Sequence, residues 1–318
     1  MLKSLLLFAL LLPFTGCIST RPAASFRVVA GYCDPPLQYQ YDPAFSPLPN
    51  LEAALTPELL ARYPRRNLLT ANAVGILPLL QELVLVEART RQQPSLAQEV
   101  RRLELRQRIS TQVALVSTAI ASVAAELDCE GERADQVASY LSNQDNRRTQ
   151  RLNVLSITIG AASGIGTTVF DNKPTQYALG IGGGLAAAGL GLLTLYGGHQ
   201  TEFAHTRNLL ADVWLERPMA TTFPPNVWYM LQEPGFSNSG QTSIAHNTRQ
   251  RWQQRAELAD PSSEEGQELA ALLFGAGGQY SADQLAVRAD MLNELQSAVH
   301  LLNQELQGLL LTLEKPAR

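Results

Sequence analysis

The chain of 318 residues has very few lysines, histidines and cysteines. It contains four histidines, three cysteines and three lysines, so nearly all of its positive charge belongs to arginine. So few histidines and cysteines leave little material for a metal cluster. The 25 basic residues are outnumbered by 29 acidic ones, and a net charge of -4 gives no basic surface of the kind that binds nucleic acid. We therefore expect neither a metal site nor a nucleic-acid partner.

Apolar residues, in contrast, are abundant. They make up 45% of the chain, and charged residues only 17%. That share is enough to bury a core, which excludes a disordered chain. Long stretches repeat apolar residues at helical spacing, and no comparable stretch has the period of two typical of strands. We expect an all-α fold, an elongated bundle of long coiled-coil-like helices with a glycine-rich helical hairpin and an extended Pro-rich N-terminal arm.

The first residues have the pattern of a secretory signal. Lys3 precedes the apolar run 4–13, which is too short to span a bilayer. The run leads into Phe14-Thr15-Gly16-Cys17, which resembles the lipobox of bacterial lipoproteins; an ordinary signal peptide with a chance cysteine is the alternative. The resemblance implies cleavage before Cys17 and a lipid such as palmitate on the mature N-terminus. Because Ile18 is not an aspartate, it also implies an outer-membrane location facing the periplasm.

Composition divides the chain into five segments. We predict a signal peptide (1–16), a lipidated extended tether (17–50), a helical body (51–150) and a glycine-rich apolar hairpin (151–199). A second part of the helical body, with a long C-terminal helix, follows (200–318). The stretch 216–281 should form loops and short helices, in which Trp228 and Trp252 are packing anchors.

Two segments carry matching apolar seams. Ile109 to Leu127 repeats at alternating spacings of four and three, and Leu285 to Leu313 repeats every seven residues. Such seams pack on each other or on a second copy. Gly131 beside Cys129 predicts a break in the first helix, and Arg288 interrupts the second seam.

Shorter helices and polar residues complete the prediction. Thr56 and Pro57 predict the start of a short helix that ends near Tyr63. A helix over 66–92 should be kinked at Pro78. We expect the histidines at the surface or at an interface, and an exposed acidic face formed by Glu130, Glu132 and Asp135.

Apart from Cys17, the chain has two cysteines, Cys33 and Cys129. In an oxidising compartment we expect this pair to form a disulfide that fixes the N-terminal arm to the helical body. Two buried thiols and a bond between molecules are the alternatives. A bridge closing so long a loop would stabilise the fold by up to about 4–5 kcal/mol in the chain-entropy model.

Residues 152–198 contain only two charges, Asp171 and Lys173. The flanking apolar arms, 152–170 and 177–196, are each about long enough to cross a hydrocarbon core. Small residues recur at every fourth position, which lets two helices approach closely. The hairpin would insert into a membrane, line an oligomeric contact, or form a close-packed pair inside the monomer. The predicted packing residues are Ser156, Gly160, Gly164, Thr168, Gly180, Gly184 and Ala188.

Motifs that resemble catalytic sites lack their structural context. The stretch 160–166 resembles the dinucleotide turn of short-chain dehydrogenases, but a polar helical pattern precedes it and no Tyr-x-x-x-Lys pair is present. The histidines lack ligand spacing, and no Gly-x-Ser-x-Gly elbow occurs. We therefore expect a non-enzymatic envelope lipoprotein without a cofactor, a scaffold or assembly factor whose partner is a membrane, its own copies or an envelope protein. A subunit of an oligomeric membrane pore or of a secretion or transport complex is the alternative.

Overall fold

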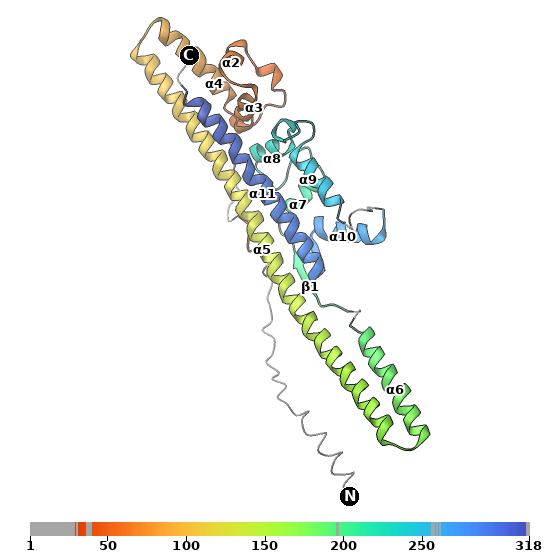
Figure 1. Cartoon of the computed structure of the whole chain (residues 1–318). Helices are drawn as coiled ribbons and strands as arrows, with labels where there is room; N and C mark the ends of the chain where they lie inside the picture. Colours follow the sequence, from red (N-terminus) through yellow and green to blue (C-terminus); the bar gives the residue numbers. More distant parts are fainter. Residues whose placement is uncertain are drawn as a thin grey trace.

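The computed structural model describes residues 29, 31–35, 40–194, 197–255, 258, 260 and 262–315. They form an elongated all-α fold built on the long helices α5 (Leu96–Val169) and α11 (Ala282–Leu313), as predicted (Figure 1). At a rise of 1.5 Å per residue, the 74 residues of α5 extend over about 111 Å. Smaller helices lie along one side of the α5–α11 pair, and the C-terminal part of α5 continues beyond them to form a hairpin with α6 (Lys173–Leu192) (Figure 1).

The core lies along the contact between α5 and α11. The two predicted seams face each other within one chain, so the first of the two predicted packings is the one observed. Leu313 closes the second seam in a half-buried position. The buried seam residues are Ile109, Val113, Val116, Ile120, Val123 and Leu127 on α5, and Leu285, Leu292, Leu295, Val299, Leu302, Leu306 and Leu309 on α11.

The predicted break at Gly131 is wrong, because α5 is continuous through this residue. Gly131 is buried against α11, and a Cβ atom at this position would lie 2.7 Å from Oδ1 of Asn293. The glycine therefore allows a close approach of two helices and does not end one. Its helix propensity penalty is about 1 kcal/mol, which the continuous seam on both sides outweighs.

The predicted kink at Pro78 is also wrong. The chain forms two helices, α3 (Arg65–Val74) and α4 (Leu77–Gln92), separated by Gly75 in a left-handed conformation with φ 80°. Pro78 lies in the first turn of α4, where its missing N–H removes no hydrogen bond. The short preceding helix α2 (Pro57–Arg62) begins at the Thr56 cap, as predicted.

The predicted tether is shorter than 17–50, because its last part packs on the helical body. Residues 43–45 and 52–54 form 3-10 turns, η2 (Pro43–Phe45) and η3 (Glu52–Ala54). The Asn72 side chain receives a hydrogen bond from the Leu48 amide and donates one to the Leu48 carbonyl, both at 3.0 Å. Phe45 and Leu48 also contact the core.

The C-terminal half adds short helices, as predicted, and a small sheet that the sequence pattern did not indicate. Strands β1 (Gln200–Ala204) and β2 (Gly277–Ser281) pair antiparallel. Trp228 and Trp252 are buried packing residues. The remaining elements are α7 (Leu209–Trp214), α8 (Pro225–Gln232), η4 (Pro234–Phe236), α9 (Ile244–Gln253) and α10 (Glu264–Phe274).

Candidate functional site: the apolar hairpin

The hairpin consists of the last part of α5, from Leu152, and the whole of α6. The two helices run side by side and away from the rest of the fold (Figure 1). A tight turn joins them, in which the Gln176 side chain donates a hydrogen bond of 2.7 Å to the Phe170 carbonyl. Pro174 lies in the first turn of α6, a position that favours proline. The predicted domain boundary at residue 150 therefore falls inside one continuous helix.

Small side chains bring the two helices together. The Ser156 hydroxyl donates a hydrogen bond of 2.8 Å to the Ala187 carbonyl on α6. A Cβ atom at Gly183 would overlap the Ser163 side chain, so this glycine is required by the contact. Nearer the turn, a Cβ atom at Gly166 would lie 3.0 Å from Leu179. This part of α5 therefore packs on α6 through serines and glycines, within one chain.

The predicted packing stripe agrees only in part with this contact. Ser156 belongs to it, and Gly180 lies beside Thr167, which a Cβ atom would approach to 3.6 Å. At Gly160, Gly164 and Gly184 a Cβ atom would meet no atom within 4 Å.

The other two predicted packing residues also lie outside the contact. Thr168 and Ala188 are exposed, and the Thr168 hydroxyl bonds to the Ile165 carbonyl of its own helix. Successive helical residues are separated by 100°, so a shift by one residue, from Gly183 to Gly184, turns the side chain away from the partner helix. On α6 the fourfold spacing fits the contact, but its phase is off by one residue. On α5 the contact residues Ser156 and Ser163 are seven residues apart, so the predicted fourfold spacing does not hold there.

The outer surface of the hairpin is apolar and uncovered. Within the described residues, α5 is the one helix with an 18-residue stretch long and apolar enough to cross a membrane. The mean hydropathy of this stretch is 1.4, and none of its residues is buried. The large apolar side chains exposed on the hairpin are Val154, Leu155, Ile157, Ile165, Val169, Phe170, Tyr177, Ile181, Leu185, Leu192 and Leu193. An exposed apolar surface of this size, with no charge between Arg151 and Asp171, indicates an interaction site.

The base of the hairpin is polar. Asp145 accepts hydrogen bonds from the His199 backbone amide at 2.8 Å and from its ring Nδ1 at 2.6 Å. This contact fixes the segment after α6 to α5. Arg147, Arg148 and Arg151 lie on α5 at the same level. The apolar surface therefore ends abruptly at a basic band.

The predicted disulfide between the two remaining cysteines is present. Cys33 and Cys129 are joined by a disulfide, with 5.7 Å between their Cα atoms. The bridge fixes the N-terminal arm to α5 within its contact with α11, two residues before Gly131. The predicted lipidation residue, Cys17, lies outside the described residues.

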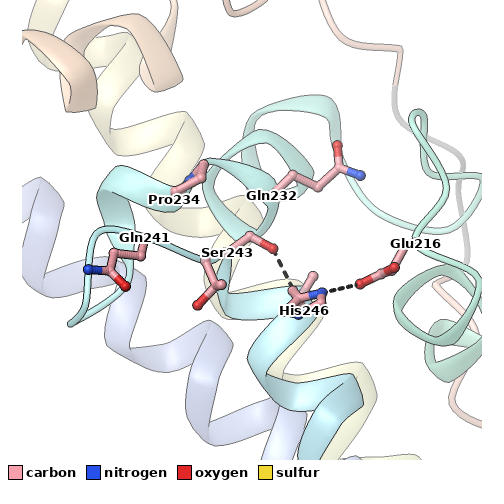
Figure 2. A pocket seen from close by; sticks show the side chains of 8 residues that line it. Glu216, Gln232, Pro234, Gln241, Ser243 and His246 are labelled. Atoms are coloured by element: carbon pink, nitrogen blue, oxygen red, sulfur yellow. Dashed lines mark hydrogen bonds and ion pairs between the residues drawn. The ribbon is translucent and has the colours of Figure 1, made fainter.

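A shallow pocket of about 420 Å³ lies between the end of α7 and α9, and Figure 2 shows its lining. Glu216 points toward His246, whose Nδ1 lies 2.7 Å from the carboxylate, and Arg249 binds the other carboxylate oxygen. Ser243 Oγ accepts the His246 backbone N–H at 3.0 Å and thereby caps α9. The carboxylate is thus shared with an arginine and the serine binds backbone, so these contacts fasten α9 to the preceding loop.

A buried polar cluster lies beneath the small sheet, and sequence reasoning missed it. Arg288 is fully buried and donates hydrogen bonds to the Leu273 carbonyl at 2.8 Å and to Asn208 Oδ1 at 3.4 Å. Burial lowers the pKa of Arg288 to about 10, so it remains a cation at neutral pH. The sequence held one indication of this cluster, because Arg288 interrupts an otherwise apolar seam. Arg288 joins α11 to the end of α10 and to the residue preceding α7.

The same cluster contradicts the expectation that every histidine is at the surface or at an interface. His205 is buried, and its Nε2 lies 3.1 Å from the Tyr280 hydroxyl. Burial, together with the nearby Arg288 cation, lowers the pKa of His205 to about 3. Burial also raises the pKa of Tyr280 to about 12.

The predicted acidic face is partly wrong as well. Glu132 and Asp135 are exposed, but Glu130 is buried and binds Arg133 at 2.7 Å. Arg133 in turn stacks over the Phe203 ring at 3.8 Å. Glu130 thus belongs to the contact between α5 and β1. Among the described residues, no three His, Cys, Asp or Glu side chains gather in a way that could hold a metal ion.

No protein-family model matches the chain, and comparison with curated proteins and with solved structures found no match.

Proposed function

We propose that the chain is a non-enzymatic lipoprotein of the bacterial cell envelope that acts as a membrane-tethered helical scaffold or assembly factor. In this proposal, a lipid on Cys17 tethers the chain, and the glycine-rich hairpin docks it. The rigid pair of α5 and α11 then presents a rod of fixed length to partner proteins.

The observation that carries the proposal is the uncovered hairpin. Its helices extend beyond the body, and no residue in the apolar 18-residue stretch of α5 is buried within the chain. A soluble enzyme gains nothing from such a surface, whereas a docking element needs it. The lipobox-like segment before Cys17 supports the same assignment, because it supplies a second membrane signal.

A second surface suits a partner protein. Leu96, Val100 and Leu103 at the far end of α5 are exposed to 81%, 56% and 59%. Their spacing of four and three places them on one face of the helix. This stripe lies at the end of α5 opposite the hairpin, which is where a scaffold would hold a partner away from its docking surface.

Crosslinking in intact cells tests the proposal. A photoreactive amino acid at Leu103 should capture an envelope protein or a second copy of the chain, identified by mass spectrometry. The same amino acid at Leu115, which is equally exposed at 58%, is the matched control outside the stripe. If neither Leu103 nor any hairpin position yields a protein or membrane adduct, the scaffold function is refuted.

The alternative is a subunit of a membrane pore or of a secretion or transport complex, and one observation favours it. Gly160, Gly164 and Gly184 face outward with free space where a side chain would be. Glycines on a lipid-facing helix permit close packing of neighbouring hairpins. A pore requires a ring, so native mass spectrometry of detergent-extracted chain should show one closed oligomer, and liposomes should release a trapped dye. A monomer without dye release excludes this alternative.

A further inference from the structure

We propose that the hairpin inserts into a lipid bilayer, and that this bilayer also holds the lipid on Cys17. The inference rests on the proposed function, from which it takes the lipid anchor. It goes further by assigning the surface that covers the hairpin.

The dimensions of the hairpin fit a hydrocarbon core. The 20 residues of α6 extend over about 30 Å, and residues 152–169 of α5 over about 27 Å. The apolar core of a typical bilayer is about 30 Å thick. Both arms are therefore long enough to reach the far side of a bilayer, and neither extends much beyond it.

The distribution of the exposed apolar residues also favours lipid over a protein partner. On α5, Ile157, Ile165 and Leu155 cover about 160° of the helix circumference, at 100° per residue. On α6 and its C-cap residue Leu193, the side chains of Tyr177, Leu185 and Leu193 cover a similar arc. A single protein partner would cover one side of the hairpin, whereas lipid surrounds all of it.

The serine and threonine hydroxyls of the α5 arm are all satisfied within the hairpin, as hydrocarbon surroundings require. On the outer surface, Thr158 donates a hydrogen bond to the Val154 carbonyl at 2.7 Å and Thr168 to the Ile165 carbonyl at 2.8 Å. Such bonds to the preceding helical turn hide a hydroxyl from its surroundings. Four more hydroxyl groups, those of Ser156, Ser163, Thr167 and Thr194, bond to backbone carbonyls in the same way or across the hairpin.

Charged and aromatic residues lie where the two surfaces of a bilayer would be. At the base, Arg147 and Arg151 are exposed and would meet anionic headgroups. At the tip, Asp171 and Lys173 are exposed on the turn, and the aromatic rings of Phe170 and Tyr177 flank them. Aromatic residues are enriched at both membrane interfaces. The segment between these two bands contains no charge.

The length of the N-terminal arm allows the lipid to lie in the same bilayer as the hairpin. Cys129, to which Cys33 is bound, precedes Leu152 by 23 residues, or about 35 Å of helix. The 16 residues from Cys17 to Cys33 span at most about 55 Å. A lipid on Cys17 therefore reaches the base of the hairpin with chain to spare. In the opposite direction the start of α5 is about 50 Å from Cys129, so a membrane at that end would require an almost fully extended arm.

Single cysteines labelled with an environment-sensitive dye test the insertion on the full chain. Because Cys33 and Cys129 are bridged and Cys17 would carry lipid, Ile165→Cys and Leu185→Cys introduce the only reactive thiol. Leu115→Cys and Leu301→Cys on the body are matched controls, since these leucines are 58% and 57% exposed against 55% and 69% in the hairpin. The unsubstituted chain measures background labelling.

The labelled variants are reconstituted into vesicles of phosphatidylethanolamine and phosphatidylglycerol. If the hairpin inserts, dyes at positions 165 and 185 should show blue-shifted emission. A nitroxide at the bilayer centre should quench most of this fluorescence. The body controls should respond only to aqueous iodide. Vesicles should stay dispersed, because the hairpin and the lipid occupy one bilayer.

Three results would overturn the inference. Quenching of the hairpin dyes by iodide would show a hairpin in water, and protection from both quenchers would show one covered by a second copy. Clustering of vesicles would place the hairpin in a different bilayer from the lipid. Flotation separates these results from a failure of the proposed function. A chain that floats with vesicles in spite of an uninserted hairpin still has its lipid anchor, whereas a chain that does not float has neither.

Discussion

Ser163 of α5 occupies the space that a side chain at Gly183 of α6 would need. A Cβ atom at Gly183 would overlap the Cβ and Oγ atoms of Ser163, whereas one at the neighbouring Gly184 would meet no atom within 4 Å. Two adjacent glycines thus have opposite environments, one against the partner helix and the other on the apolar outer surface. This pair defines which face of α6 packs on α5.

Alanine at these two positions should change the stability of the hairpin in opposite directions. Gly183→Ala forces the helices apart, and such overpacking costs about 1–3 kcal/mol. Gly184→Ala should stabilise α6 by up to about 1 kcal/mol, because alanine has the higher helix propensity. Hydrogen exchange of α6 amides in detergent measures both effects, with a tenfold change for about 1.4 kcal/mol. Equal effects of the two substitutions would show that the observed face is wrong.

The sequence predicted the existence of the hairpin but not the phase of its contact face. Both arms are rich in glycine, so several fourfold series run through the same residues. The series Gly180, Gly184 and Ala188 competes with Leu179, Gly183 and Ala187, and the two differ by one residue. Spacing alone does not separate them, because the contact also depends on the turn and on Ser163 of the other arm. A prediction of the phase needed the geometry of the turn.

The long seams were predictable because each depends on a repeat within one helix. The errors arose at single residues whose role depends on distant segments. Gly131 was expected to break α5, but it faces Asn293 across the bundle. Pro78 was expected to kink a helix, but Gly75 ends the preceding helix first. A five-residue strand pair likewise has too little sequence for a period to be recognised.

Replacement of Arg288 should strongly destabilise the fold. Arg288→Ala leaves a cavity in the seam and removes a donor from the Leu273 carbonyl and from Asn208. We expect a loss of about 3 kcal/mol in urea unfolding, because an unpaired buried polar group costs about 1–3 kcal/mol and the cavity adds to it. Arg255→Ala is the control: its ion pair with the exposed Asp290 should contribute less than about 1 kcal/mol. Similar losses for both variants would contradict a special role for Arg288.

Protonation of His205 should destabilise the fold as the pH falls. The pKa of His205 is about 3 in the folded chain and about 6.5 once it unfolds, so the unfolded state binds the additional proton between these values. The stability that depends on neutral His205 is therefore complete above pH 6.5 and is lost progressively below it, by about 1.4 kcal/mol per pH unit. His205→Gln removes this titration. The difference in unfolding free energy between parent and variant should shrink from pH 6.5 to 4.5; a constant difference refutes the prediction.

Reduction of the Cys33–Cys129 bridge should release the N-terminal arm and destabilise the body. The bridge joins residues 96 positions apart. In the chain-entropy model such a loop corresponds to up to about 4–5 kcal/mol. Non-reducing peptide mapping of periplasmic protein should recover the two cysteine peptides as one species, and Cys33→Ser with Cys129→Ser should lower the unfolding midpoint. Alkylation of both thiols without reductant would exclude the bridge in the exported chain.

Replacement of Cys17 separates the two membrane attachments that we propose. Cys17→Ser abolishes the thiol that would carry lipid, so labelled palmitate should be incorporated into the parent and not into the variant. If the hairpin inserts, the variant should still resist extraction from membranes by high salt, because insertion is apolar and is not screened. A further variant, Cys17→Ser with Ile165→Asp and Leu185→Asp, should then become extractable, since a carboxylate inside the hydrocarbon core is disfavoured, by about 2.5–3.5 kcal/mol at the centre and less toward its edges. Palmitate on Cys17→Ser would disprove lipidation at this residue. Ready extraction of Cys17→Ser by salt would show that the lipid alone holds the chain.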